Sequence, residues 1–464
     1  MSKRLILVLA LAFVVSIAVC AYAEVQNVKV SGDLLMRAIS RTNFTLLKTD
    51  DKYKVGGLTS TARLRVDADL TDNVIATVRL LNERSWGANS LGIPTVYGKI
   101  IGGIVDSVGD SVTIDLAYVT LKEFLYSPLT LTVGRQELRF GNALIIGDVD
   151  SNLLASEWQI PWDLSSRKAF DAIRANLNYD PLVVDFIYAK VDEVIPAWWL
   201  ATGLSERDDT DLYGVNAAYN LKDLGITGNA QLYYFGRVNR LPVYSSTSLT
   251  KQDICNTVGM LVSGKVVDNL TGSMEYAYQF GNAAYDTLGV NSGVNLDRRA
   301  WALQGMLNYA FQTKYNPSLA VAYTYLSGDK TDDGVDNNWD PMFEDQMPNS
   351  IVNALFPQSN VQALHVVGNI KPTEDLTLSA KYGYYMLAQK LNGTSIPGVY
   401  DSSYSTTDKK DVGNALDLTA TYDYTEDVQL GLTFGYFNPG SAFDKSDGYK
   451  QNATQLIGSM KVTF

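Results

Sequence analysis

The sequence predicts an all-β protein, an antiparallel transmembrane β-barrel of about 18 strands with short periplasmic turns and long extracellular loops. Apolar and polar residues alternate with a period of two along most of the chain, as expected for strands with one apolar and one polar face. Short turns alternate with long polar stretches. The composition, with 28 Tyr and 36 Gly but one His among 464 residues, suits a β wall better than a catalyst.

The overall charge and hydropathy exclude several other classes of protein. A hydrophobic fraction of 46% with 19% charged residues is typical of a folded chain. A net charge of -12 argues against nucleic acid as a partner, because nucleic-acid binders carry a basic surplus. After Val19, no apolar run approaches the roughly 20 residues of a membrane-spanning helix.

The N-terminus has the pattern of an export signal. Lys3 and Arg4 precede an apolar stretch from Leu5 to Val19, and Ala21-Tyr22-Ala23 forms a cleavage site. We expect residues 1–23 to be removed, leaving residues 24–464 as a single barrel domain. A lipoprotein signal at Cys20 is the alternative, but Val19 stands where that signal prefers a smaller residue.

The mature chain has little capacity for cross-linking or metal chemistry. Cys255 is its single thiol, so no intramolecular disulfide is possible, and no Cys/His cluster has zinc spacing. We expect no cofactor. Without Lys3 and Arg4, 36 basic residues face 50 acidic ones, a net charge of -14.

The spacing of breaks between strands distinguishes a barrel from a soluble sandwich. Leu270 to Gly281 shows the alternation clearly, with apolar residues mostly at even positions. Eight short turns are expected at 70–73, 126–128, 179–181, 220–225, 267–269, 313–317, 371–375 and 425–427. Nine long polar stretches lie near 41–56, 86–110, 138–167, 193–209, 240–252, 282–296, 328–359, 390–410 and 439–450. Seventeen such connections join 18 strands, with both termini on the short-turn side.

The C-terminal segment carries a second barrel signature. Gln455 to Phe464 alternates in polarity and ends in an aromatic residue, which resembles the signal read by the barrel-assembly machinery. Aromatic residues near strand ends would form girdles against the outer-membrane lipid: Tyr188, Tyr219, Tyr309, Tyr422 and Tyr436.

Several short motifs resemble the alginate-export outer-membrane porins. Gly134-Arg135-Gln136 and Ser327-Gly328-Asp329 look like a strand end and the start of a long loop in that family. Phe170-Asp171, Trp339 to Phe343, Val412 to Leu418 and Phe437 to Gly440 add to the resemblance in order along the mature chain. Asn414-Ala415 departs from the pattern, standing where a His-Glu-like pair is expected. The resemblance implies a barrel that exports an acidic polysaccharide.

Side chains alternate between the two faces of a strand, and this alternation, called parity below, assigns a set of charged residues to the lumen. There they would determine whether the channel prefers anions or cations. The basic residues are Lys29, Arg37, Arg63, Arg65, Arg79, Arg174, Arg237, Lys265, Arg298, Lys381 and Lys461. The acidic residues are Asp33, Asp67, Asp69, Glu83, Asp115, Asp185, Glu275 and Asp417. We define the basic belt as the six basic residues expected near mid-strand: Arg37, Arg63, Arg65, Arg79, Arg174 and Lys381. The belt would attract anions, or alternatively form cross-strand ion pairs that only stiffen the wall.

Other residues leave alternatives open. Regular alternation predicts that Arg135 faces outward, unless a bulge at Gly134 turns its side chain into the lumen. Asp329, Asp333 and Asp340 partly match the spacing of a calcium loop, although an ordinary acidic surface loop is the better interpretation. His365 has inward parity and is expected to be a polar lining residue.

Three functions from different classes follow. The first is a porin for passive passage of anionic saccharides or small anionic solutes. The second is a receptor or adhesin whose barrel is plugged by its loops. An enzyme is the third and is not expected, because the chain has no Gly-x-Ser-x-Gly nucleophile elbow.

Overall fold

The computed structural model describes residues 26–46, 54–86, 112–149, 160–192, 209–239, 252–286, 293–329, 334–390, 395–396, 404–405, 408–444 and 450–464. The expected signal peptide and its cleavage site lie outside these residues. Among the described residues, no helix has the length and apolar character needed to cross a bilayer.

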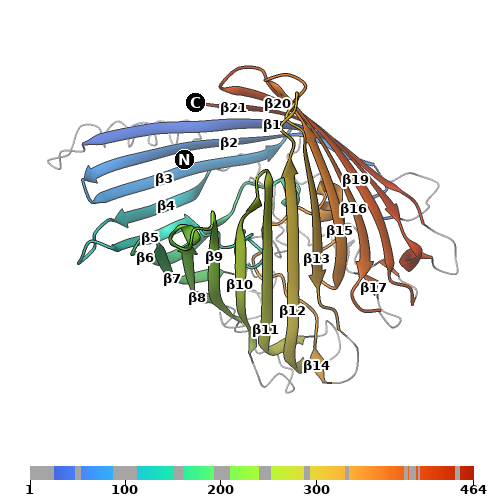
Figure 1. Ribbon diagram of the computed structural model, residues 1–464, viewed down its shortest axis with the longest axis horizontal. Helices are drawn as coiled ribbons and strands as arrows, with labels where there is room; N and C mark the ends of the chain where they lie inside the picture. The colour runs from blue at the N-terminus through green and yellow to red at the C-terminus, as the bar shows by residue number, and fades with distance from the viewer. Residues whose placement is uncertain are drawn as a thin grey trace, which may run out of the picture.

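Eighteen antiparallel strands form the wall, each paired with its neighbour in chain order (Figure 1). They are β1 (Asn27–Thr42), β2 (Lys54–Thr71), β3 (Val74–Ser85), β4 (Thr113–Leu121), β5 (Leu129–Glu137), β6 (Ala169–Asn178), β7 (Leu182–Asp192), β8 (Asp209–Asn220), β9 (Gly228–Asn239), β10 (Asp253–Val267), β11 (Leu270–Asp286), β12 (Gly293–Ala310), β13 (Ser318–Leu326), β15 (Val361–Ile370), β16 (Leu376–Leu387), β19 (Asp411–Asp423), β20 (Val428–Pro439) and β21 (Ala453–Thr463).

The barrel closes between its first and last strands. β1 pairs with β21 from Asp33 opposite Thr463 to Thr42 opposite Thr454. The terminal residue extends this seam, because the backbone N–H of Phe464 donates to Gly32 O at 3.0 Å and the N–H of Gly32 donates to Phe464 O at 2.8 Å. A Cβ at Gly32 would lie 2.6 Å from the backbone carbonyl of Arg63 and 2.7 Å from the Phe464 ring, so the close approach of backbone here requires a glycine. The 18 described strands of the wall therefore close into a ring without a free edge.

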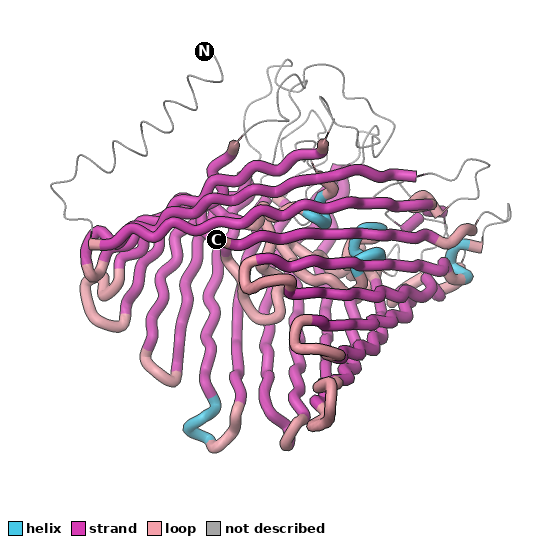
Figure 2. The backbone as a smooth tube through the Cα atoms, turned by 90° about the horizontal axis from the view of Figure 1, so that it is seen from above, coloured by secondary structure: helices cyan, strands magenta, loops and turns pink. Residues whose placement is uncertain are grey.

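The predicted alternation of connections is confirmed. All eight short turns join the strand pairs that the sequence indicated, and all nine long connections lie at the opposite strand ends. The strand bounds differ most from expectation at 282–296, where β11 continues to Asp286 and β12 begins at Gly293, inside the stretch expected as a loop. Strand pairing needs only backbone groups, so the ladder continues where the side chains become polar. Figure 2 shows a wall made almost entirely of strand.

The outer face of the wall is apolar. Outward-facing side chains such as Val30, Leu232 and Val262 are large, apolar and exposed, as a lipid-facing surface requires. The inward-facing neighbours in the same strands include charged and hydroxyl side chains. Apolar side chains on the outer face therefore do not form the core of this protein.

The core lies inside the barrel, where long loops fold against the inner wall. One cluster packs residues 138–149 and 339–343 against inward side chains of β6 to β13. The other packs α3 (Ser350–Leu355) against β15 to β21. Shorter elements accompany these loops: η2 (Trp162–Leu164), η3 (Leu221–Leu224), β14 (Val335–Asp336), β17 (Ser395–Ile396), β18 (Tyr404–Ser405) and η4 (Ser441–Phe443). Parity within the strands could not predict this packing, because it depends on where loops return.

Candidate solute pathway through the barrel

Three belt arginines lie together on the inner face of β2 and β3. Arg65 and Arg79 are directly opposite each other across these strands, and Arg63 is the next inward residue of β2. Arg63 Nε lies 2.9 Å from Asp33 Oδ1 on β1, and Arg65 Nε lies 2.7 Å from Asp67 Oδ2 on its own strand. This part of the belt is a set of ion pairs.

Arg79 bridges two carboxylates at the junction of β3 and β4. Its Nε lies 2.5 Å from Asp115 Oδ2, and its Nη2 lies 2.5 Å from Glu137 Oε1. The strand register shifts between Arg79 and Leu80, so that Asp115 and Leu116 are both buried instead of alternating. An irregularity of this kind redirects a side chain that regular pairing would turn away.

Arg174 continues the ion-paired wall on β6. Its Nε lies 2.8 Å from Asp185 Oδ1 on β7, and its guanidinium carbon lies 5.6 Å from the centre of the Phe140 ring. Phe140 belongs to the loop that folds into the barrel after β5. Arg174 therefore stands where the wall meets this loop.

The two charges of each wall pair differ in their access to water. The side chain of Arg65 is 37% exposed against 23% for Asp67, and that of Arg174 is 35% exposed against 6% for Asp185. The guanidinium group is also the more exposed partner in the Arg63–Asp33 and Arg79–Asp115 pairs. Glu137 is an exception, with a side chain more exposed than that of Arg79. In the Arg63, Arg65 and Arg174 pairs the wall presents its cations to the lumen and recesses its anions, whereas Arg79 is itself buried.

Arg37 and Lys381 complete the predicted belt but lie apart from each other. Arg37 on β1 donates to the carbonyl of Leu164 at 2.9 Å, and Lys381 on β16 donates to the carbonyl of Met347 at 3.1 Å. Neither forms an ion pair with a carboxylate in the described part of the chain. Arg37 joins the group on β2 and β3, whereas Lys381 stands in register with Asp417 on a different part of the wall.

Asp417 and its neighbours hold α3 against the wall. Asp417 Oδ2 accepts the backbone N–H of Ser350 at 2.7 Å and the side-chain amide of Asn349 at 3.1 Å. His365 is buried beside them, with Nε2 at 2.9 Å from the hydroxyl of Tyr385, which donates to Asn349 Oδ1 at 2.7 Å. The single histidine therefore takes part in a docking contact.

A buried charge network holds the loop after β13. Arg237 Nη2 lies 2.6 Å from both Asp253 Oδ2 and Asp340 Oδ2. Arg298 reaches the same two carboxylates at 2.8 Å and 3.1 Å. Burial alone would raise the pKa of Asp340, but the two guanidinium groups outweigh it and lower the pKa to about 2. Asp340 therefore stays ionised and fastens the loop to β9, β10 and β12.

Glu275, predicted to line the lumen, fastens the loop after β5. Its carboxylate accepts the hydroxyl of Tyr233 at 2.9 Å and the backbone N–H of Asn142 at 3.3 Å. Glu275 and Arg237 both lie on the inner face of their strands. Both bind returning loops.

The two family-like motifs serve different parts of the structure. Gly134 has φ of 122°, but Arg135 still pairs with Asp171, which shares its strand face with the exposed Ile173 on the outer wall. Gln136 is buried and donates to the carbonyl of Ala172 at 3.0 Å. The register of β5 with β4 and β6 is regular through Gly134, so no bulge turns Arg135 inward and it faces outward.

The Ser327-Gly328-Asp329 motif shapes the loop after β13. Ser327 Oγ accepts the backbone N–H of Trp301 at 2.9 Å and donates to the carbonyl of Asn337 at 2.8 Å. Asp329 Oδ1 accepts the backbone N–H of Asn337 at 3.3 Å. A Cβ at Gly328 would lie 1.9 Å from Asn360 Oδ1, so a glycine is required there.

The weak calcium candidate finds no support among the described residues. Asp333 lies outside them, Asp329 accepts backbone hydrogen bonds, and Asp340 pairs with two arginines. Within the described ranges, no group of three or more His, Cys, Asp or Glu side chains is placed to hold a metal ion.

Sequence reasoning missed several residues that fix the lumen. Arg41 is fully buried and ion-pairs with Asp163 of a returning loop, while its Nε donates to Gln455 Oε1 at 2.8 Å. Asp253 binds both Arg237 and Arg298 but stands at the first position of β10, where parity is least certain. The apolar residues Trp339, Met342 and Phe343 were the available signal, because they are unusual in a solvated loop.

Comparison with known structures supports the fold. The crystal structure of Pseudomonas aeruginosa OpdQ has a TM-score of 0.53 at 14% identity, over 95% of this chain and 100% of that one. Acinetobacter baumannii OccAB4 has a TM-score of 0.51 at 11% identity, over 94% of this chain and 98% of that one. The P. aeruginosa outer membrane protein opdK has a TM-score of 0.53 at 10% identity, over 94% and 99% of the two chains.

Sequence comparison defines the family. No curated protein matches the chain. The model of the alginate export family matches residues 28–456, nearly the whole chain. With the closed barrel, this match makes the protein an integral outer-membrane channel. The chain belongs to the alginate export family.

Proposed function

We propose that the channel allows passive passage of anionic saccharides or small anionic solutes. The observation that carries this proposal is the unequal exposure of the wall ion pairs. Arg63, Arg65 and Arg174 on the inner wall are each more exposed than the carboxylate that neutralises them. Arg79 is more exposed than Asp115 but less exposed than Glu137. A solute in the lumen therefore approaches guanidinium groups first.

The physical basis is the distance dependence of charge interactions. An exposed cation acts at short range on a passing anion, whereas a carboxylate buried behind it acts from farther away. The Debye length of about 10 Å at 0.1 M salt means that this difference is felt locally and weakens as salt is added. Planar guanidinium groups also match the geometry of carboxylates on acidic sugars.

The loops that fold into the barrel favour a second candidate, a receptor or adhesin with a plugged lumen. Residues 339–343 and α3 pack into two buried clusters inside the wall. Conductance distinguishes the candidates, since a plugged receptor would carry no steady current whereas an open channel would.

Planar-bilayer recording of the purified protein tests the proposal. We expect steady conductance and, in a salt gradient, a reversal potential whose sign indicates anion preference. Uronate oligomers should block the current at lower concentrations than neutral oligomers of equal length. Steady current with cation preference would contradict the anionic cargo. The absence of current would favour the plugged receptor.

A further inference from the structure

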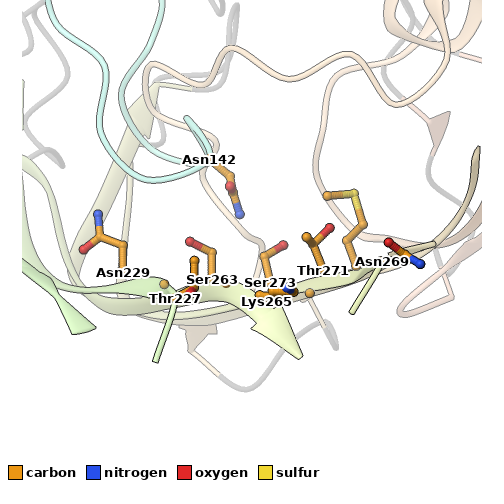
Figure 3. A pocket seen from close by; sticks show the side chains of 12 residues that line it. Asn142, Thr227, Asn229, Ser263, Lys265, Asn269, Thr271 and Ser273 are labelled. Carbon is orange, nitrogen blue, oxygen red and sulfur yellow. The ribbon is translucent and has the colours of Figure 1, made fainter. Parts of the chain in front are cut away.

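A pocket of about 610 Å³ lies on the inner wall at the short-turn end of β9, β10 and β11 (Figure 3). Asn229, Ser263 and Ser273 stand directly opposite one another on these three strands. Asn142 lies above this floor and belongs to the loop that Glu275 fastens. Because the short turns are periplasmic, the pocket opens at the periplasmic mouth.

Ser263, Ser273 and Asn229 supply the polar groups of this pocket that are available for a ligand. Figure 3 shows the side chains of Ser263, Ser273 and Thr271 rising from the floor toward Asn142. In the described part of the chain, no side-chain hydrogen bond engages the hydroxyls of Ser263 and Ser273. Figure 3 shows the amide nitrogen of Asn229 turned toward the pocket, whereas its Oδ1 is buried in the wall and has no hydrogen-bond partner among these residues. The two serine hydroxyls and the amide nitrogen of Asn229 can therefore form hydrogen bonds with a ligand in the pocket.

The charge of the pocket differs from that of the arginine-lined wall. Lys265 lines it, but its Nζ lies 2.6 Å from Asp268 Oδ1 in the adjoining turn. Glu275, two residues beyond Ser273, already accepts hydrogen bonds from Tyr233 and Asn142. Met306 stands opposite Ser273 and offers an apolar surface. Hydroxyl and amide groups beside an apolar contact suit a neutral ligand with hydroxyls on one edge and C–H groups on a face.

We propose that this pocket binds a neutral polyhydroxylated molecule, such as a neutral sugar unit, at the periplasmic mouth. The amide of Asn229 and the hydroxyls of Ser263 and Ser273 hydrogen-bond its hydroxyl groups, and Met306 packs against its C–H face. The volume lies within the range of about 300–1,000 Å³ typical of small-molecule sites. This site goes beyond the passage of anions and does not depend on it.

The test measures ligand binding by the complete folded barrel in detergent, with maltotriose as the neutral probe and a trimer of galacturonate as the acidic probe. Saturation-transfer NMR gives an affinity without requiring any current. Ser263→Ala with Ser273→Ala removes two hydroxyls and should weaken maltotriose binding about tenfold, the effect of losing two modest hydrogen bonds. Ser379→Ala with Thr419→Ala is the matched control, an opposed inward-facing pair on β16 and β19.

The expected result is maltotriose binding that the control variant retains and the pocket variant loses, with heat-modifiable migration confirming that both barrels are folded. Equal maltotriose affinity in the pocket variant and the wild type would overturn the site. If the galacturonate trimer binds at least as tightly as maltotriose, and the pocket variant weakens both equally, the proposal that the ligand is neutral would be overturned. A failure of anion selectivity would instead appear in the reversal potential and leave this measurement unaffected.

Discussion

Ion pairs occupy two regions of the lumen, and they differ in burial and in role. On the β1–β7 wall, pairs such as Arg65–Asp67 and Arg174–Asp185 keep their arginines in contact with water. At the foot of the loop after β13, Arg298 and Asp340 are shielded from water in a shared network. The wall pairs are placed to influence a solute, whereas the network is placed to hold a loop.

Burial determines what each kind of pair contributes to stability. An exposed pair contributes about 0–1 kcal/mol, because water and salt already screen its charges. Removing one partner from a buried pair costs about 3–5 kcal/mol, because the remaining charge has no water to solvate it. The same residue types therefore tune electrostatics in one region and fix structure in the other.

The largest expected effect comes from Asp340→Asn. The substitution leaves Arg237 and Arg298 with one carboxylate fewer to neutralise them. We therefore expect the free energy that stabilises the docked loop to decrease by about 3 kcal/mol. Hydrogen exchange of residues 335–346 should accelerate strongly, and urea should unfold the barrel at a lower concentration.

Asp268→Asn is the matched control, because Asp268 pairs with Lys265 but is almost fully exposed. It should leave both measurements unchanged. If residues 335–346 of the Asp340→Asn variant exchange hydrogen at the wild-type rate, the buried network does not hold the loop.

A pH effect should follow from Glu344 in the same loop. Burial raises the pKa of Glu344 to about 8, and Asp345 and Asp148 add to the increase. The docked loop thus binds a proton that the unfolded chain releases near its usual pKa of 4.5. Stability is therefore greatest below that value and falls as pH rises toward about 8.

Urea midpoints measured across this pH window check the prediction. The wild-type midpoint should decrease with rising pH, and Glu344→Gln should remove most of that slope because the amide does not ionise. A wild-type midpoint that increases over this window, or an unchanged slope in the variant, would show that Glu344 is not protonated in the docked loop.

These two regions also differ in how well the sequence predicted them. Strand number, turn positions and the inward parity of Arg63, Arg65 and Arg79 followed from local alternation, because neighbouring strands fix one another's register. The pairing of Arg237 with Asp340 joins residues 103 positions apart through a returning loop. No periodic pattern encodes such a contact. The docking role of Arg237, Glu275 and Asp417 was therefore not foreseen.

The smallest expected effect on stability comes from removing a complete wall pair. Arg65→Gln with Asp67→Asn deletes both charges, so no isolated charge remains, and unfolding free energy should change by less than about 1 kcal/mol. Urea unfolding of the refolded barrel measures it. A loss comparable to that of Asp340→Asn would place the wall pairs in the same structural class as the buried network.

The most direct test of the central claim is the reversal potential of Arg63→Gln, Arg65→Gln and Arg79→Gln combined, measured across a salt gradient at low and high ionic strength. Arg135→Gln is the matched control, because Arg135 pairs with Asp171 on the outer face. The triple variant should shift toward cation preference, most at low salt where screening is weakest, while the control keeps the wild-type value. If the triple variant retains wild-type anion preference at low salt, the exposed arginines do not set the selectivity of the channel.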